Sequence, residues 1–231
     1  MSLPVNSIKA VLFDLDGTLF DYDGSVTKAL HGWLPELGVD PSDDVLELWR
    51  RLERKHYPAA HSGVISWSEH RRLRLREFLT ALERPVDEPV LLEVFAGYLD
   101  RFEQSYRPYP DAARALNRVR AAGITTGILT NGSTGRQTGK LRGTGLLGLC
   151  DVVCASEDLG AAKPDPDAFL RACVRLGEVP GAVLMVGDNH EWDVLAARAA
   201  GLPALHLDRR GAHLGPDPYR ISTLDELLIS S

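Results

Sequence analysis

The chain has 231 residues, of which 44% are hydrophobic and 25% are charged, values that are ordinary for a globular protein. Its length is enough for one large domain or for a domain with an insertion. The formal net charge of −6 argues against a protein-wide nucleic-acid surface, which would need a basic excess. The net charge does not exclude an anionic substrate, because a bound cation or a nearby lysine can make the local charge of a cleft positive.

The three cysteines, Cys150, Cys154 and Cys173, are odd in number and have no CxxC spacing. This pattern indicates reduced thiols in a reducing compartment. The first residues show no signal-peptide pattern, and no apolar run approaches the roughly 20 residues of a membrane span. We therefore predict a cytoplasmic protein that has neither a membrane nor a nucleic acid as its partner.

Short aliphatic runs alternate with helical patterns in residues 9–20 and 111–208. Strands are predicted near 9–14, 124–130, 152–155, 182–187 and 204–207. Helices that separate most of them are predicted near 111–122, 133–142, 166–177 and 191–200. Alternation of strand and helix implies parallel pairing with right-handed crossovers. The predicted fold class is α/β, a Rossmann-like parallel sheet with helices on both faces, because the strand runs are almost wholly apolar.

Residues 22–107 contain no clear strand run and are rich in Leu, Glu, Arg and Trp at helical spacing, which predicts three to five helices. The Pro108-Tyr109-Pro110 segment marks the return to the alternating pattern, since X-Pro steps disfavour helix continuation. The predicted organisation is a discontinuous catalytic core of residues 1–21 and 108–231, with a helical cap domain of residues 22–107 inserted after the first strand.

Acidic and phosphate-binding residues follow the predicted strands. Open parallel sheets bind ligands at the carboxyl ends of their strands. Six side chains are therefore expected to converge on one site: Asp14, Asp16, Thr130, Lys163, Asp188 and Asp193. Each motif alone is commonly a surface turn, but their order and their placement at strand ends favour a shared site.

Asp14 ends the first strand, so its carboxylate would be held rigidly at the edge of the sheet. Such a carboxylate can attack phosphorus and form an aspartyl-phosphate. Asp16 lies two residues further on, where it can protonate a departing alcohol and then deprotonate water. General acid/base help of this kind is typically ~10²–10⁴-fold. Gly17 permits the tight backbone turn that both roles need.

Several carboxylates in one cleft repel one another unless a cation neutralises them. Oxygen ligands with retained waters suit Mg²⁺, which is the cofactor that we predict. Asp14 and Asp188 are expected to be direct ligands together with the backbone carbonyl of Asp16, while Asp193 would hold a metal-bound water. The metal would orient the phosphoryl group and offset its charge.

The Thr130-Asn131-Gly132-Ser133 segment lies between a predicted strand and a predicted helix. A helix N-terminus offers unpaired N–H groups and a favourable dipole to phosphate. The predicted phosphate donors are the Thr130 hydroxyl and the N–H groups of Asn131 and Gly132, with Lys163 as a point charge. Together they would stabilise the charged oxygens of a phosphoryl transition state.

These motifs resemble those of the haloacid dehalogenase superfamily. Asp14–Leu19 is similar to the first motif of that family, Leu129–Gly132 to the second, Lys163-Pro164 to the third, and Gly187-Asp188 with Asp193 to the fourth. The resemblance covers the whole core and the position of the cap. It implies a Rossmann-like core and Mg²⁺-dependent chemistry on the phosphomonoester of a small metabolite.

Two departures from the family pattern affect this interpretation. Asn189 follows the first aspartate of the fourth motif, where a small residue is frequent. His190 either contacts substrate or metal or lies on an exposed rim, and the rim is the favoured interpretation. The true dehalogenases lack the second aspartate of the first motif, so Asp16 argues against dehalogenation.

Three shorter motifs lie elsewhere in the chain. Residues 143–148 fit GxGxxG but follow a predicted helix rather than a strand, so we expect a loop and no dinucleotide site. Residues 135–141 resemble a P-loop, but the segment is one residue short and lacks the Ser/Thr. Thr223–Glu226 fits a capping box that opens a last short helix.

The predicted cap carries clustered basic residues: Arg50, Arg51, Arg54, Lys55, His56, Arg71, Arg72, Arg74 and Arg76. They could recognise an acidic or a second phosphate group. The favoured interpretation is a solvated helix face paired with nearby glutamates, namely Glu47, Glu53, Glu69 and Glu77. The cap aromatics are expected to form its core: Trp33, Trp49, Tyr57 and Trp67.

The leading hypothesis is a phosphoric monoester hydrolase, in which water releases phosphate from an aspartyl-phosphate on Asp14. A sugar-phosphate mutase uses the same motifs and differs in how the cap treats water. A phospho-acceptor signalling receiver or a silent binding module belongs to a different class, against which Asp16 and the complete acidic set argue. The substrate and the oligomeric state, monomer or homodimer, stay open.

Overall fold

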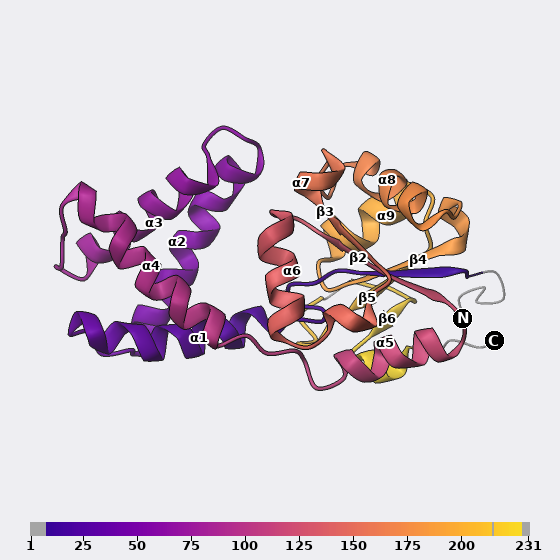
Figure 1. Ribbon diagram of the computed structural model, residues 1–231, viewed down its shortest axis with the longest axis horizontal. Coiled ribbons are helices and arrows are strands. Elements are labelled where there is room, and N and C mark those ends of the chain that lie inside the picture. Colours follow the sequence, from indigo (N-terminus) through magenta and orange to yellow (C-terminus); the bar gives the residue numbers. More distant parts are fainter. Residues whose placement is uncertain (1–7, 214, 228–231) are drawn as a thin grey trace. The chain divides into compact units, whose positions relative to one another are not determined.

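The computed structural model describes residues 8–213 and 215–227, and residues 1–7, 214 and 228–231 of the predicted core lie outside this range. Six strands form one parallel sheet in the order β3-β2-β1-β4-β5-β6 (Figure 1). The strands are β1 (Ala10–Phe13), β2 (Thr125–Thr130), β3 (Val152–Ala155), β4 (Val183–Gly187), β5 (Ala204–Leu207) and β6 (Arg220–Ile221). The strand order reverses at β1, between β2 and β4, and this switch point is where such sheets bind ligands.

Helices cover both faces of this sheet. They are α5 (Ala112–Ala121), α6 (Thr134–Gly143), α7 (Ser156–Leu159), α8 (Pro166–Leu176) and α9 (Ala196–Ala199). Figure 1 shows α8 and α9 on one face and α5 on the opposite face. The face under α8 packs Leu12 and Met185 of the central strands against Phe169. All five residues of β4 are buried, which explains its unbroken apolar sequence. The predicted α/β fold is confirmed.

The structure differs from the predicted elements at two places. The sequence predicts five strands, but β6 adds a sixth beside β5. It has only two residues and begins with an exposed arginine, so it carries no apolar run. The helix predicted over 191–200 begins instead as a π-helical segment, His190–Leu195, and continues as α9. The Asn189 side chain accepts hydrogen bonds from the N–H groups of Glu191 and Trp192, and this caps the segment.

The shorter motifs are found in the following conformations. The capping box of Thr223 and Glu226 is present and opens a single 3₁₀ turn, Leu224–Glu226. Gly143 ends α6 rather than following a strand, and a 3₁₀ turn, Leu147–Leu149, comes after it. The segment over 143–148 is thus a helix end and a turn, not the strand-to-helix glycine turn of a dinucleotide site.

The chain divides into two compact units. One contains the N-terminal segment to Tyr22 and the chain from Tyr106 onward, and the other is Asp23–Ser105. The helices of the second region are α1 (Tyr22–Trp33), α2 (Asp43–His61), α3 (Trp67–Ala81), α4 (Glu88–Gln104) and a 3₁₀ turn, Leu34–Leu37. The sequence places the boundaries at 21/22 and 107/108, and the assignment of each unit as a domain stays a prediction.

The two points at which the chain leaves and re-enters the sheet unit are held together. Phe20 forms an isolated β-bridge with Pro108, and the Asp21 N–H donates to the Arg107 carbonyl over 3.0 Å. The Arg107 guanidinium also pairs with the Asp21 carboxylate at 2.7 Å. Among the helices of the described residues, none has the length and apolar composition that crossing a membrane requires.

The core of the Asp23–Ser105 unit is aromatic. Trp33 and Trp49 are buried as predicted, with the Trp49 ring centroid 4.8 Å from Phe78 and 4.6 Å from Tyr98. The buried guanidinium of Arg74 lies 4.0 Å from the Trp49 centroid, a cation–π arrangement. Two expected core residues differ. Trp67 is 40% exposed because it begins α3 at the edge of the unit, and Tyr57 packs against it half-buried.

The basic residues of this unit pair with its glutamates, as expected. Arg54 contacts Glu47, Lys55 contacts Glu77, and Arg72 contacts Glu69. The fourth pair departs from the predicted solvated face. Arg74 is buried beside Trp49 and reaches Glu53 at 3.1 Å, so this pair belongs to the core rather than to the surface.

Replacing Trp49 tests the aromatic core. Trp49→Ala removes a fully buried ring and leaves Arg74 without its aromatic partner, so we expect a loss of about 3–5 kcal/mol in the free energy of unfolding. Urea unfolding followed by circular dichroism measures it. Trp67→Ala is the matched control and should cost less than about 1 kcal/mol. Equal losses in the two variants would contradict this packing.

Candidate active site

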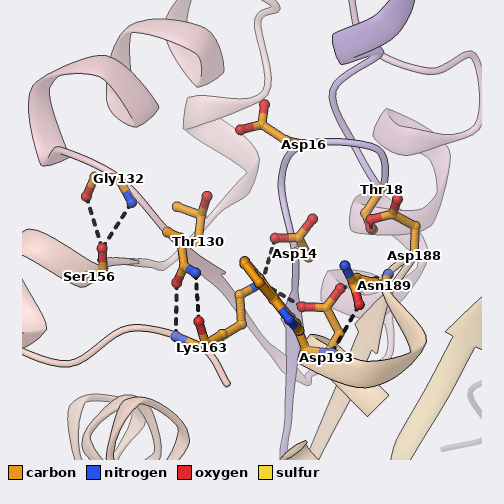
Figure 2. A network of polar contacts seen from close by, with 12 residues as sticks. Asp14, Asp16, Thr18, Thr130, Gly132, Ser156, Lys163, Asp188, Asn189 and Asp193 are labelled. Atoms are coloured by element: carbon orange, nitrogen blue, oxygen red, sulfur yellow. Dashed lines mark hydrogen bonds and ion pairs between the residues drawn. The ribbon is translucent and has the colours of Figure 1, made fainter. Parts of the chain in front are cut away.

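Three carboxylates meet where β1 and β4 end. Phe13 and Val186 are paired across these neighbouring strands, so Asp14 and Asp188 leave the sheet side by side. Asp193 enters the same space from the π-helical segment (Figure 2). One oxygen from each of Asp14, Asp188 and Asp193 lies within 4.8 Å of the others. These three residues, called the acidic cluster below, are three of the four aspartates predicted to bind the metal.

A buried lysine joins two members of the acidic cluster. Lys163 Nζ lies 2.6 Å from Asp14 Oδ1 and 2.6 Å from Asp193 Oδ1 (Figure 2). The lysine is 3% exposed, and a charge so deeply buried is stable only when it is paired. Burial lowers the pKa of Lys163, but the two carboxylates outweigh this effect and hold the pKa above its ordinary value. Lys163 is therefore a fixed cation.

The carboxylates still carry an excess of negative charge. Burial raises the pKa of Asp14 well above its ordinary value; Lys163 opposes the rise, and the charges of Asp193 and Asp188 add to it. Asp188 keeps contact with solvent, but loss of water on its inner side and the charge of Asp193 raise its pKa to about 7. A divalent cation bound by these oxygens would relieve the repulsion, and an all-oxygen donor set fits Mg²⁺.

Glycines and a threonine allow the acidic cluster to pack closely. Gly17 has φ +92°, and a Cβ there would collide with the Asp188 carboxylate. A Cβ on Gly187 would collide with Asp193. The Thr18 hydroxyl donates to Asp188 Oδ1 over 3.3 Å. The predicted turn at Gly17 is present, but the sequence reasoning missed Thr18 and the spatial need for Gly187.

Asp16 does not join the acidic cluster. Its carboxylate points away from Asp14 (Figure 2) and pairs with Lys140 Nζ at 2.7 and 2.6 Å, while Gln137 Nε2 donates to it over 3.3 Å. Gln137 and Lys140 lie three residues apart on one face of α6, a spacing that could have indicated a shared target. To contact a group held at Asp14, the Asp16 side chain must rotate away from Lys140.

The segment after β2 is hydrogen-bonded to the loop that carries Lys163. The Asn131 amide donates to the Lys163 carbonyl over 2.8 Å and accepts from the Lys163 N–H over 2.9 Å. This reciprocal pair fixes the backbone from which the Lys163 side chain extends. Asn131 thus positions the lysine through its side chain, a role that sequence reasoning missed when it assigned only the Asn131 N–H.

Two of the predicted phosphate donors have protein partners. Gln137 Nε2 donates to the buried Thr130 hydroxyl over 2.5 Å, which leaves the Thr130 hydrogen available to donate. The Gly132 N–H is directed to Ser156 Oγ at 2.9 Å (Figure 2). Ser156 was not predicted, because it lies 24 residues away and carries no motif.

His190 is half-buried rather than exposed on a rim. Its ring centroid lies 4.1 Å from that of His213 and 5.0 Å from that of His206. The favoured rim interpretation is therefore replaced by packing against two other imidazoles.

The chain resembles known proteins in sequence and in fold. Residues 8–201 match the model of the haloacid dehalogenase-like hydrolases. A glyceraldehyde 3-phosphate phosphatase from Methanopyrus kandleri is 30% identical over 91% of this chain and 88% of its own. An (S)-2-haloacid dehalogenase from Pseudomonas sp. is 29% identical over 96% of both chains. A HAD-hydrolase from Bacillus subtilis, solved bound to magnesium, has the same fold, with a TM-score of 0.82 at 22% identity over 96% of this chain and 97% of its own.

Gly187→Ala tests the close packing around Asp193. The added methyl group must displace either β4 or the π-helical segment, so we expect a loss of about 1–3 kcal/mol in the free energy of unfolding. Gly135→Ala, on α6 with open space around its Cβ position, is the matched control and should be neutral or stabilising by up to about 1 kcal/mol. Urea titrations compare the two, and an unchanged midpoint for Gly187→Ala would refute the predicted collision.

Proposed function

The chain belongs to the haloacid dehalogenase-like hydrolases, and we propose that it is a Mg²⁺-dependent phosphatase acting on the phosphomonoester of a small metabolite. The observation that carries the proposal is the acidic cluster of Asp14, Asp188 and Asp193, with Asp16 two residues beyond Asp14. A phosphatase of this kind needs a nucleophile, an acid/base and a place for a cation, and these four carboxylates supply all three.

In the first proposed step, a carboxylate oxygen of Asp14 attacks the phosphorus atom. The bond between phosphorus and the substrate alkoxide breaks, and Asp16 gives its proton to the departing oxygen. The products of this step are the free alcohol and an aspartyl-phosphate on Asp14. Lys140 holds the ionised Asp16 at 2.6 Å, so before this step Asp16 leaves Lys140 and takes up a proton from solvent.

In the second step, water attacks the phosphorus atom of the aspartyl-phosphate. Asp16, now ionised, takes a proton from the water, and the bond between phosphorus and Asp14 breaks. Inorganic phosphate leaves, Asp14 is again a free carboxylate, and Asp16 again carries the proton that it gave up in the first step. One residue therefore serves as acid in the first step and as base in the second.

The charge of the transferred phosphoryl group needs fixed positive partners. Lys163 is a buried cation 2.6 Å from the proposed nucleophile, so it stands beside the incoming phosphorus with no need to reorganise. The Thr130 hydroxyl and the N–H of Asn131 are the further proposed donors, and the Gly132 N–H joins them only by leaving Ser156. Bound at Asp14, Asp188 and the Asp16 carbonyl, with Asp193 holding a coordinated water, Mg²⁺ would supply charge neutralisation and orientation.

A haloacid dehalogenase is the second candidate function, because relatives of similar identity carry that activity. Asp14 could attack carbon instead of phosphorus and displace a halide. Asp16 favours the phosphatase, since a halide leaving group needs no proton. The acidic cluster favours it too, since a site for a neutralising cation suits a phosphate dianion. A sugar-phosphate mutase would use the same residues, whereas Asp16 and the complete acidic set argue against a phospho-acceptor module.

The primary experiment measures inorganic phosphate from a panel of sugar phosphates, nucleotides and small phospho-acids, with Mg²⁺ or with chelator. We expect release that depends on Mg²⁺. In parallel, halide release from both enantiomers of 2-chloropropionate is measured. Halide without phosphate would replace the proposal with dehalogenation, and isomerised sugar phosphate without release would replace it with a mutase.

Asp14→Asn tests the nucleophile. The amide has the same shape but cannot displace the alkoxide, so we expect phosphate release to fall by at least about 10³-fold with the fold intact. Asp167→Asn, an exposed carboxylate paired with Arg171, is the matched control and should keep full activity. Near-normal turnover in Asp14→Asn would remove its nucleophilic role.

Asp16→Asn tests the acid/base. We expect both steps to slow by about 10²–10⁴-fold for an alkyl phosphate. With p-nitrophenyl phosphate the first step should be spared, because that leaving group needs little protonation, so aspartyl-phosphate should accumulate as a burst. Rapid-quench kinetics separate the steps, and normal rates with an alkyl phosphate would exclude the role.

A further inference from the structure

Three histidines gather beside the acidic cluster. His190 begins the π-helical segment, His206 lies in β5, and His213 lies in the segment between β5 and β6. Their ring centroids are 5.0, 4.1 and 5.2 Å apart, and one ring nitrogen from each lies within 4.8 Å of the others. This histidine cluster belongs entirely to the sheet unit, and the proposed phosphatase chemistry does not use it.

His206 is poised as a ligand. It is 3% exposed, and its Nε2 lies 3.2 Å from the backbone carbonyl of Asp188. A carbonyl oxygen only accepts, so this contact places the proton on Nε2 and the lone pair on Nδ1. Nδ1 is buried and has no hydrogen-bond partner within the described part of the chain. A buried imidazole lone pair without a partner is costly, and a bound cation would satisfy it.

The other two histidines are held by buried carboxylates. The Asp217 carboxylate lies 3.4 Å from His190 Nε2 and is itself fixed by Arg198 at 3.1 Å. Asp208 accepts the backbone N–H of His213 over 3.1 Å. The Asp188 carbonyl and the Asp217 carboxylate thus lie against a ring nitrogen of His206 and of His190, while Asp208 holds the backbone of His213. Metal-binding histidines are typically oriented in this way, by a carboxylate or carbonyl on the far side of the ring.

We propose that His190, His206 and His213 form a binding site for a late first-row divalent cation, taken here as Zn²⁺, with a fourth position open to water or another ligand. Three neutral imidazoles suit Zn²⁺ and disfavour Mg²⁺, which prefers oxygen. The site is therefore distinct in chemistry from the acidic cluster. His206 contacts the backbone carbonyl of Asp188, and His190 shares the π-helical segment with Asp193. A bound cation would therefore fix the backbone that carries both aspartates.

The test is calorimetric titration of the untagged, metal-free full chain with Zn²⁺, in excess Mg²⁺ to occupy oxygen-ligand sites. We expect one Zn²⁺ per chain. His190→Ala and His213→Ala should each weaken binding by at least about tenfold. His31→Ala, an exposed histidine in α1, is the matched control and should bind Zn²⁺ unchanged.

A second measurement uses the unmodified chain, so its result does not depend on whether the variants fold. Co²⁺ added to the unmodified chain in excess Mg²⁺ should give the intense visible absorption of a four-coordinate nitrogen site, and Zn²⁺ should bleach it. Circular dichroism checks each variant, and His213→Gln replaces the alanine variant if that one is unfolded. Absence of stoichiometric Zn²⁺ binding, or equal affinity in the histidine variants, would overturn the proposal.

Discussion

The contact between Lys163 and two buried carboxylates is the constraint on which the rest of the site depends. A parallel sheet delivers strand-end carboxylates to one edge, and without a cation their repulsion and loss of water would cost several kcal/mol. Lys163 answers this by contacting Asp14 and Asp193 at 2.6 Å each. The reciprocal amide pair with Asn131 then fixes the lysine backbone. The ammonium group thus connects the end of β1 and the π-helical segment to the loop that carries Lys163.

Charge balance explains the remaining arrangement. The region contains four carboxylates, those of the acidic cluster and Asp16, and two buried ammonium groups, Lys163 and Lys140. Each aspartate of the first motif therefore has its own lysine. The formal charge that remains is −2, which one divalent cation would neutralise. This excess of negative charge supports the proposed binding of one Mg²⁺ ion.

The sequence predicted the parts that depend on local pattern. The runs of β1 and β4 are short but fully buried, so their apolar sequences indicate where each strand ends and which aspartate follows it. The pairing of Asp16 with Lys140 was missed because it joins residues 124 positions apart through the packing of α6. The histidine cluster was missed for the same reason: its members sit on three separate segments with no motif spacing. Likewise, β6 is too short to show a period of two.

The β-bridge between Phe20 and Pro108 has an evolutionary consequence. This bridge, with the Asp21–Arg107 pair, makes the inserted chain leave and return at adjacent points. No paired strand residue of the described sheet lies between these two points, so a change in the length of the inserted segment removes no strand pairing. A lineage can thus rewrite the inserted segment by recombination while the residues that carry out the chemistry stay in place. The sheet, whose strand pairings must be kept, is thereby encoded apart from an inserted segment that can change in sequence and length.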